Sequence, residues 1–268
     1  MIREITIGQY YPADSVIHRL DPRVKIIATF LFIISLFVFD SFIGYAVVVA
    51  FLAACIILSK VPFSYMVKGL KAIVMLLMIT VIINMFMTPG EPMVTLWKLT
   101  ITKEGFRAAI FMGLRLMLLI IGSSLMTLTT TPNNLTDALE SLLKPLKKFK
   151  VPVHEIAMMM SIALGFIPIL IEETDKIMKA QMARGADFEN KNLIKRVKSY
   201  IPILVPLFIS AFRRAGDLAM AMEARCYRGD EGRTKMKPLK YCGRDYIAFV
   251  ACITYMAVVI IVSKVFYL

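Results

Sequence analysis

Two short segments of the sequence repeat a pattern of small residues followed by an arginine. Residues 180–185 read Ala-Gln-Met-Ala-Arg-Gly, and residues 221–226 read Ala-Met-Glu-Ala-Arg-Cys. An arginine side chain offers five N–H donors in a planar fork, and two alanines one helical turn apart let another backbone approach closely. This combination favours insertion into a protein groove. The alternative is that each arginine only stabilises the negative end of a helix dipole, which does not explain why the alanines recur.

Each arginine is predicted to lie at the C-terminal end of an amphipathic helix. Ahead of each arginine, residues that are mostly apolar or small recur every three or four positions. This spacing places them on one face of a helix. Gly185 follows the first arginine in a position that commonly ends a helix. The second helix is expected to begin after the proline-containing segment 201–206. The two stripes are Ile171, Thr174, Met178 and Met182 in the first helix, and Ala211, Ala215, Leu218 and Met222 in the second.

Methionines are concentrated on these helices. The chain contains 19 methionines, and this unbranched, polarizable side chain repacks against differently shaped partners. The cluster therefore favours an adaptable contact surface, with ordinary core packing as the alternative interpretation. The residues that we assign to this surface are Met158, Met159, Met178, Met182, Leu218 and Met222.

Composition places these helices in a membrane protein. Hydrophobic residues make up 58% of the 268 positions and charged residues only 19%, and several windows are nearly free of charge over the length of a bilayer crossing. The formal net charge of +13 fits basic cytoplasmic loops. The basic stretches are not interleaved with aromatic residues as in single-strand-binding sites, so we expect no nucleic-acid partner.

Five apolar segments are predicted to span the membrane. If all five cross, every strongly basic loop falls on the same side. The positive-inside rule then places the N-terminus in the cytoplasm and the C-terminus outside. The predicted spans are residues 24–39, 42–58, 72–87, 106–128 and 246–262.

The predicted fold is therefore an all-α integral membrane protein with an additional cytosolic or interfacial module. Residues 1–128 would hold four transmembrane helices, and residues 246–268 the fifth. Residues 129–245 would form a cytoplasmic module of about three amphipathic helices, which contains the two arginine segments.

Two segments allow more than one structural interpretation. Residues 151–171 are apolar, but two prolines, a glycine and a glutamate interrupt them. We expect this stretch to lie along the inner membrane interface or on protein, with entry into the bilayer left open. The loop 89–105 alternates apolar and polar residues, which is typical of a short hairpin or interfacial strand. A plain connector is the simpler interpretation of this loop.

The sequence offers little for catalysis. The motifs of serine hydrolases, zinc proteases and P-loop nucleotide sites do not occur. Two histidines and four cysteines without a Cys-x-x-Cys pair do not suggest a metal site. We expect a protein that is not an enzyme and binds no cofactor. The deepest charge in a predicted span, Arg115, is interpreted as a structural anchor, because an ion-driven carrier would need more ionisable groups.

With these motifs placed, nearly the whole chain resembles the T component of energy-coupling-factor (ECF) transporters, the family that includes the cobalt-transport permease. The resemblance includes the segment His-Arg-Leu-Asp-Pro-Arg-Val-Lys at 18–25 and Thr-Thr-Pro at 130–132. Its most specific part is the pair of motifs at Arg184 and Arg225. The second motif has Cys226 where the family usually has glycine, which leaves open whether the second helix ends in the same way.

The resemblance implies a cell-membrane scaffold of a prokaryotic vitamin or micronutrient importer. Its two arginine-tipped coupling helices would dock on two ABC-type ATPase subunits, which would hold the ATP and magnesium. The methionine-rich surface would contact a separate substrate-binding membrane subunit, the S component. Two alternatives remain: an ion-coupled permease or channel that acts alone, and a membrane-anchored assembly factor without transport. The residues implied in ATPase coupling are Ala183, Arg184, Gly185, Ala224, Arg225 and Cys226.

Overall fold

The structure is a computed structural model that describes residues 10–39, 41–96, 99–186, 188, 193–229, 236 and 238–266. The regular secondary structure of these residues is helical apart from one short β-hairpin, which confirms the predicted all-α membrane class. The chain forms two compact units. One combines residues 10–138 with 239–266, and the other is Leu139–Pro238, which lies inside the predicted module 129–245.

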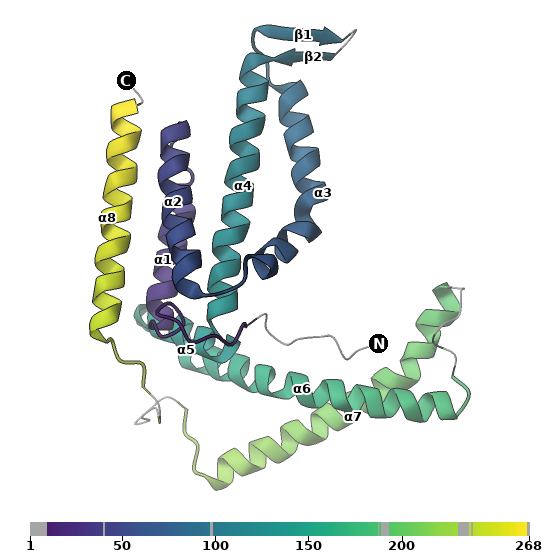
Figure 1. Ribbon diagram of the computed structural model, residues 1–268. Helices are drawn as coiled ribbons and strands as arrows, with labels where there is room; N and C mark the ends of the chain where they lie inside the picture. Colours follow the sequence, from purple (N-terminus) through teal and green to yellow (C-terminus); the bar gives the residue numbers. More distant parts are fainter. Residues whose placement is uncertain are drawn as a thin grey trace. The chain divides into compact units, whose positions relative to one another are not determined.

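The first unit contains a helix at each of the five predicted spans (Figure 1). Phe32, Leu36, Tyr45, Val48, Leu118 and Val259 are among its buried core residues. α3 packs along α4. The helices are α1 (Pro22–Ser35), α2 (Phe42–Ser59), α3 (Phe63–Met87), α4 (Lys103–Thr129) and α8 (Gly243–Phe266), and α5 (Pro132–Leu143) follows α4.

Four helices of the described part are long and apolar enough to cross a membrane: α2, α4, α8 and α6 (Val153–Ala183). α1 has only 14 residues, and the apolar part of α3, Ile73–Met87, is also shorter than about 20 residues. α6 qualifies by length and composition, but it packs against α7 (Leu193–Ala224) in the second unit. The expectation for residues 151–171 therefore stays a prediction.

Close helix packing in the first unit depends on a glycine. A Cβ atom on Gly122 of α4 would overlap the ring of Phe32 on α1. Such contacts matter in a bilayer, because lipid tails are as apolar as the side chains and helices associate through close packing. Arg115 of α4 also ties these elements, since its Nε donates to the carbonyl of Leu36 over 2.9 Å. Arg115 is thus a structural anchor, as predicted.

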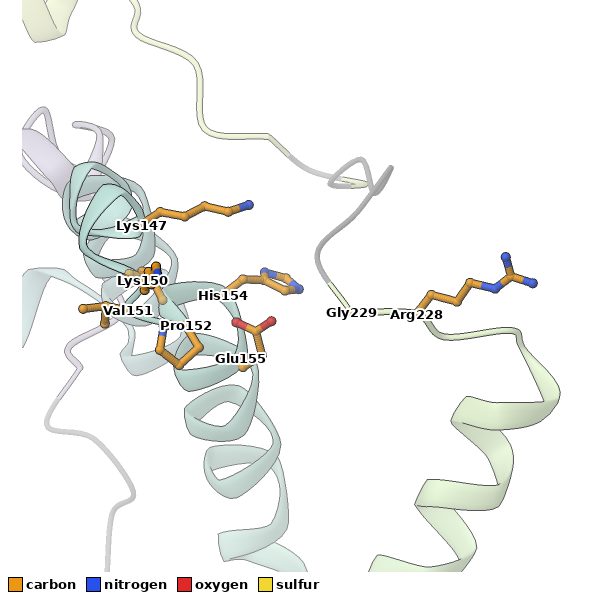
Figure 2. A pocket seen from close by; sticks show the side chains of 9 residues that line it. Lys147, Lys150, Val151, Pro152, His154, Glu155, Arg228 and Gly229 are labelled. Carbon is orange, nitrogen blue, oxygen red and sulfur yellow. The ribbon is translucent and has the colours of Figure 1, made fainter.

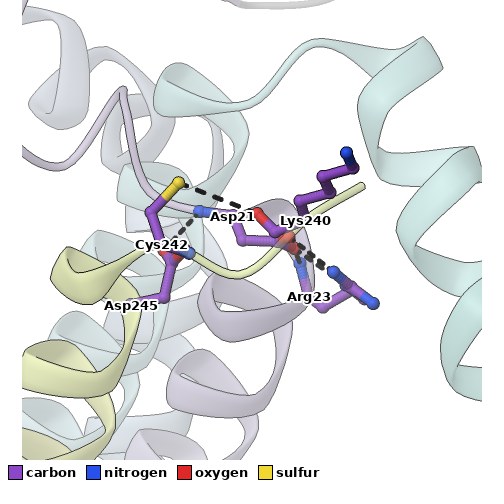
Figure 3. A network of polar contacts seen from close by, with 5 residues as sticks. All are labelled: Asp21, Arg23, Lys240, Cys242 and Asp245. Atoms are coloured by element: carbon purple, nitrogen blue, oxygen red, sulfur yellow. Dashed lines mark hydrogen bonds and ion pairs between the residues drawn. The ribbon is translucent and has the colours of Figure 1, made fainter. Parts of the chain in front are cut away.

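A polar network fastens the two ends of the first unit together (Figure 3). The backbone N–H of Asp21 donates to Oδ1 of Asp245 over 2.8 Å, and the N–H of Cys242 donates to Oδ2 over 2.7 Å. Arg23 pairs with Asp21 at 2.8 Å and lies over the Tyr241 ring. Burial opposes ionisation of Asp21, but the hydrogen bonds from Arg23 outweigh it and hold the pKa of this carboxyl below its ordinary value. The network fixes the start of α1 against the start of α8.

A buried lysine extends this anchoring to α4. Nζ of Lys25 donates to the carbonyl of Thr129 over 2.8 Å and to that of His18 over 3.2 Å. The Thr129 carbonyl is the last of α4, so the ammonium group binds the negative end of that helix. The sequence 18–25 singled out above therefore holds together α1, α4 and α8.

The loop before α4 forms a hairpin, so the simpler interpretation as a plain connector is wrong. β1 (Pro92–Leu96) pairs with β2 (Leu99–Thr102) in antiparallel register. Thr102 then caps α4, because its hydroxyl accepts a hydrogen bond from the N–H of Gly105 and donates to the carbonyl of Thr88. The hairpin thus connects α3 to α4 with its last residue as the helix cap.

Candidate functional site: two arginine-tipped helices

α6 and α7 form an antiparallel pair that crosses within the second unit (Figure 1). Nη2 of Arg214 contacts Oε2 of Glu173 at 3.1 Å, and Nε2 of Gln181 donates to the carbonyl of Pro202 over 3.4 Å. Residue numbers therefore run in opposite directions along the two helices, and their C-terminal ends lie at opposite ends of the pair. The tip of α7 lies on the order of 35 Å of helix beyond Pro202.

The first tip ends in a tight hydrogen-bonded turn. The N–H of Gly185 donates to the carbonyl of Met182 over 2.9 Å, and the N–H of Ala186 donates to that of Gln181 over 3.0 Å. Gly185 has a φ of +88°, in the left-handed region. This is the Schellman arrangement, which satisfies the last carbonyls of a helix with the backbone alone. Arg184 is left as the last residue before the turn.

The second tip has the same construction despite its cysteine. The N–H of Cys226 donates to the carbonyl of Glu223 over 2.8 Å, and the N–H of Tyr227 donates to that of Met222 over 3.0 Å. Cys226 takes the left-handed conformation, with a φ of +55°. The question left open by the sequence is therefore answered: both helices terminate alike, and Arg184 and Arg225 occupy equivalent positions.

The left-handed conformation of Cys226 is expected to lower the free energy of unfolding relative to glycine at this position. A residue with a Cβ atom costs about 1 kcal/mol more than glycine in this region. We expect Cys226→Gly to raise the free energy of unfolding by roughly 0.5–1 kcal/mol, while Cys226→Ala, which removes the thiol but keeps the strain, leaves it unchanged. Denaturant unfolding of the purified chain in detergent measures both. A stabilising effect of alanine equal to that of glycine would show that the thiol, and not the backbone, is responsible.

The six residues assigned to ATPase coupling are all solvent-exposed. Among the described residues neither Arg184 nor Arg225 has an ion-pair partner, and neither side chain takes part in the hydrogen bonds that end its helix. The structure thus places two exposed guanidinium groups at the two ends of one helix pair. Their geometry suits recognition of acidic or carbonyl groups on two separate surfaces.

The methionine-rich surface is only partly exposed. Met159 and Met182 have 59% and 49% of their surface exposed, while Met158, Met178, Leu218 and Met222 are half-buried. The assigned residues therefore belong partly to the packing of the second unit, which is the alternative left open by the sequence.

A larger exposed apolar surface lies on α7 and was missed by the sequence prediction. Its residues recur at helical spacing, so they share one face. Phe212 is 74% exposed and stacks on Phe208, with the ring centroids 6.4 Å apart. The signal was the periodicity itself, which two prolines masked. We call this surface the α7 stripe: Ile201, Leu204, Val205, Phe208, Ile209 and Phe212.

Comparison with known proteins gives matches over nearly the whole chain. Residues 13–236 match the family CbiQ, described as cobalt transport protein. The chain is 57% identical over 269 residues to a protein of Clostridium kluyveri, covering 100% of this chain and 99% of the relative. It is 54% identical over 267 residues to one of Ruminiclostridium cellulolyticum (100% of both) and 48% identical over 258 residues to one of Bacillus subtilis (96% and 97%). All three are named energy-coupling factor transporter transmembrane protein EcfT.

Proposed function

This chain belongs to the CbiQ family of cobalt transport proteins, and we propose that it is the energy-coupling transmembrane scaffold of an ECF-type importer. In this proposal two ABC-type ATPase subunits hold ATP and magnesium, and a separate S component binds a vitamin or another micronutrient. The chain itself catalyses no reaction and needs no cofactor. It transmits the motion of the ATPases to the S component.

One observation carries this proposal: the two tips are built alike and lie at opposite ends of one helix pair. Two equivalent helix tips suit two related ATPase subunits, each with a groove that binds one arginine. A helix-stabilising role would not require the same small residues ahead of both arginines. The full-length similarity to relatives named as transmembrane proteins of energy-coupling factor transporters supports the same assignment.

The mechanism follows from the mechanical connection between the tips. When ATP draws the ATPase subunits together, each subunit moves the helix end that it holds. α6 and α7 are joined where Arg214 contacts Glu173, so a displacement of the tips changes the angle at which the helices cross. The α7 stripe lies on the moving pair and offers the apolar area that an S component would cover.

The membrane topology proposed with this mechanism has the N-terminus in the cytoplasm and the C-terminus outside. It places the basic segments before α1, between α2 and α3, and around α6 and α7 on the cytoplasmic side. The tips then face the compartment that contains ATP.

Reconstitution tests the proposed function. We expect substrate uptake into proteoliposomes only when the chain, both ATPases and an S component are present, and none with the chain alone. ATPases with an inactivated Walker A lysine control for ATP use. Flux through the chain alone would favour the permease or channel alternative. Unchanged vitamin uptake in cells that lack the chain would favour the assembly factor.

A further inference from the structure

A short basic segment joins α5 to α6. It is the 3₁₀ helix η1 (Lys144–Phe149), which is exposed along its length and ends at Lys150 in the left-handed conformation. η1 contains three lysines in six residues, and Lys150 directly after it is a fourth. The exposed side chain of Phe149, 82% accessible, and those of Leu143 and Leu146 stand beside the lysines. An exposed segment that mixes lysines with apolar side chains is typical of membrane surfaces.

A cavity of about 390 Å³ opens beside this segment (Figure 2). Lys147 and Lys150 line one side of it together with Pro152, His154 and Glu155, and the loop after α7 closes the other side with Arg228 and Gly229. In Figure 2 the guanidinium of Arg228 points away from the α6 side, so Lys147 and Lys150 are the cations best placed to reach an occupant.

Among the described residues that line the cavity, cations outnumber carboxylates. Glu155 is the single carboxylate in this described lining, alongside Lys147, Lys150 and Arg228. Glu140 is engaged by Nδ1 of His154 over 2.9 Å. The described lining therefore carries more positive than negative charge, which suits an anion.

The neighbouring apolar side chains decide between the possible anions. A free phosphate would need the lysines alone, and an acidic protein surface would leave Phe149 in contact with polar groups. An anionic phospholipid uses both features, because its headgroup offers a phosphate and its glycerol–acyl region accepts an aromatic ring. Thr129, the end of a candidate membrane span, lies 15 residues before Lys144 in the sequence.

We propose that η1 and this cavity bind the phosphate-bearing headgroup of an anionic phospholipid in the cytosolic leaflet. Lys147 and Lys150 contact the phosphate, and Phe149 enters the interfacial region of the bilayer. The leaflet follows from the topology proposed above, whereas binding of the headgroup does not depend on any partner subunit. The lipid holds the start of α6 at the membrane surface while the tips move.

Native mass spectrometry of the purified full chain in detergent tests this site. The probes are phosphatidylglycerol, phosphatidylcholine and inorganic phosphate, each titrated separately. We expect Lys147→Gln/Lys150→Gln to weaken retention of phosphatidylglycerol about tenfold. The matched double variant Lys176→Gln/Lys179→Gln, which removes the same charge from exposed positions on α6, should change it less than twofold. Phosphatidylcholine retention should not respond to either change.

Phe149→Ser distinguishes lipid from free phosphate. Weaker retention of phosphatidylglycerol in this variant supports the lipid site. Unchanged retention, together with displacement of the lipid by equimolar phosphate, would identify a site for free phosphate and overturn the proposal. Equal retention of phosphatidylglycerol by the wild type and the Lys147/Lys150 variant would also overturn it. Because the chain is tested alone, failure of the transport scaffold would leave this result unaffected.

Discussion

Replacement of both Arg184 and Arg225 by glutamate is expected to abolish ATP-driven uptake by the reconstituted transporter. A buried arginine at the centre of an interface commonly contributes at least about 2 kcal/mol, so the loss of one tip should weaken binding of its ATPase roughly 30-fold. Glutamate also reverses the charge that each proposed groove would receive. Single variants should retain the contact at the other tip, and the double variant should lose co-purification of both ATPases.

The structure provides sharp controls for this experiment. Both arginines are exposed, and the turns that follow them are held by backbone hydrogen bonds, so the substitutions should leave the helices intact. Circular dichroism and size-exclusion chromatography check this point. Lys176→Glu/Lys179→Glu reverses two exposed charges elsewhere on α6, and Arg184→Lys/Arg225→Lys keeps the charge but removes the planar fork. A double glutamate variant that still co-purifies with the ATPases and supports uptake would refute the proposed docking.

The sequence predicted the helices of the first unit because apolar windows of bilayer length have few other structural solutions. Two helices begin earlier in the chain than the sequence predicted. α3 begins at Phe63 instead of residue 72, since a helix continues through basic residues that count as loop in a hydropathy pattern. α7 begins at Leu193 and runs through Pro202 and Pro206, which were read as a lead-in. The long-range polar network around Asp245 could not be predicted, because its partners are more than 200 positions apart.

The sequence located the two arginine segments at helix ends but did not predict their geometry. The repeated alanines and arginines were visible in the sequence, while the shared turn was not, because Cys226 gives no indication of a left-handed backbone. The opposite placement of the tips depends on the antiparallel contact of α6 with α7, which no local pattern encodes. The α7 stripe has helical spacing, but it lies in the proline-containing segment after which the sequence predicts the helix to begin, and proline is uncommon inside a helix.

Conversion of the α7 stripe to a charged surface is expected to release the S component. Phe208 and Phe212 are 62% and 74% exposed, and burial of a phenylalanine contributes about 1.5–3 kcal/mol. Loss of both contacts should weaken binding on the order of 100-fold or more, and Phe208→Glu/Phe212→Glu would also place charges in an apolar contact. The expected result is a complex that keeps both ATPases, loses the S component and transports no substrate.

The two large effects are separable, and this separation tests the assignment of the surfaces. The tip variants should lose the ATPases, whereas the stripe variant should lose only the S component, so co-purification of each partner gives a different pattern. Met236→Glu, at a loop position that is 98% exposed, introduces a charge without touching the stripe and should bind both partners normally. If the stripe variant still holds the S component, the contact must lie on the methionine-rich surface, and Met159→Glu/Met182→Glu should then release it. If neither variant releases the S component, its contact does not lie on the exposed apolar faces of α6 and α7.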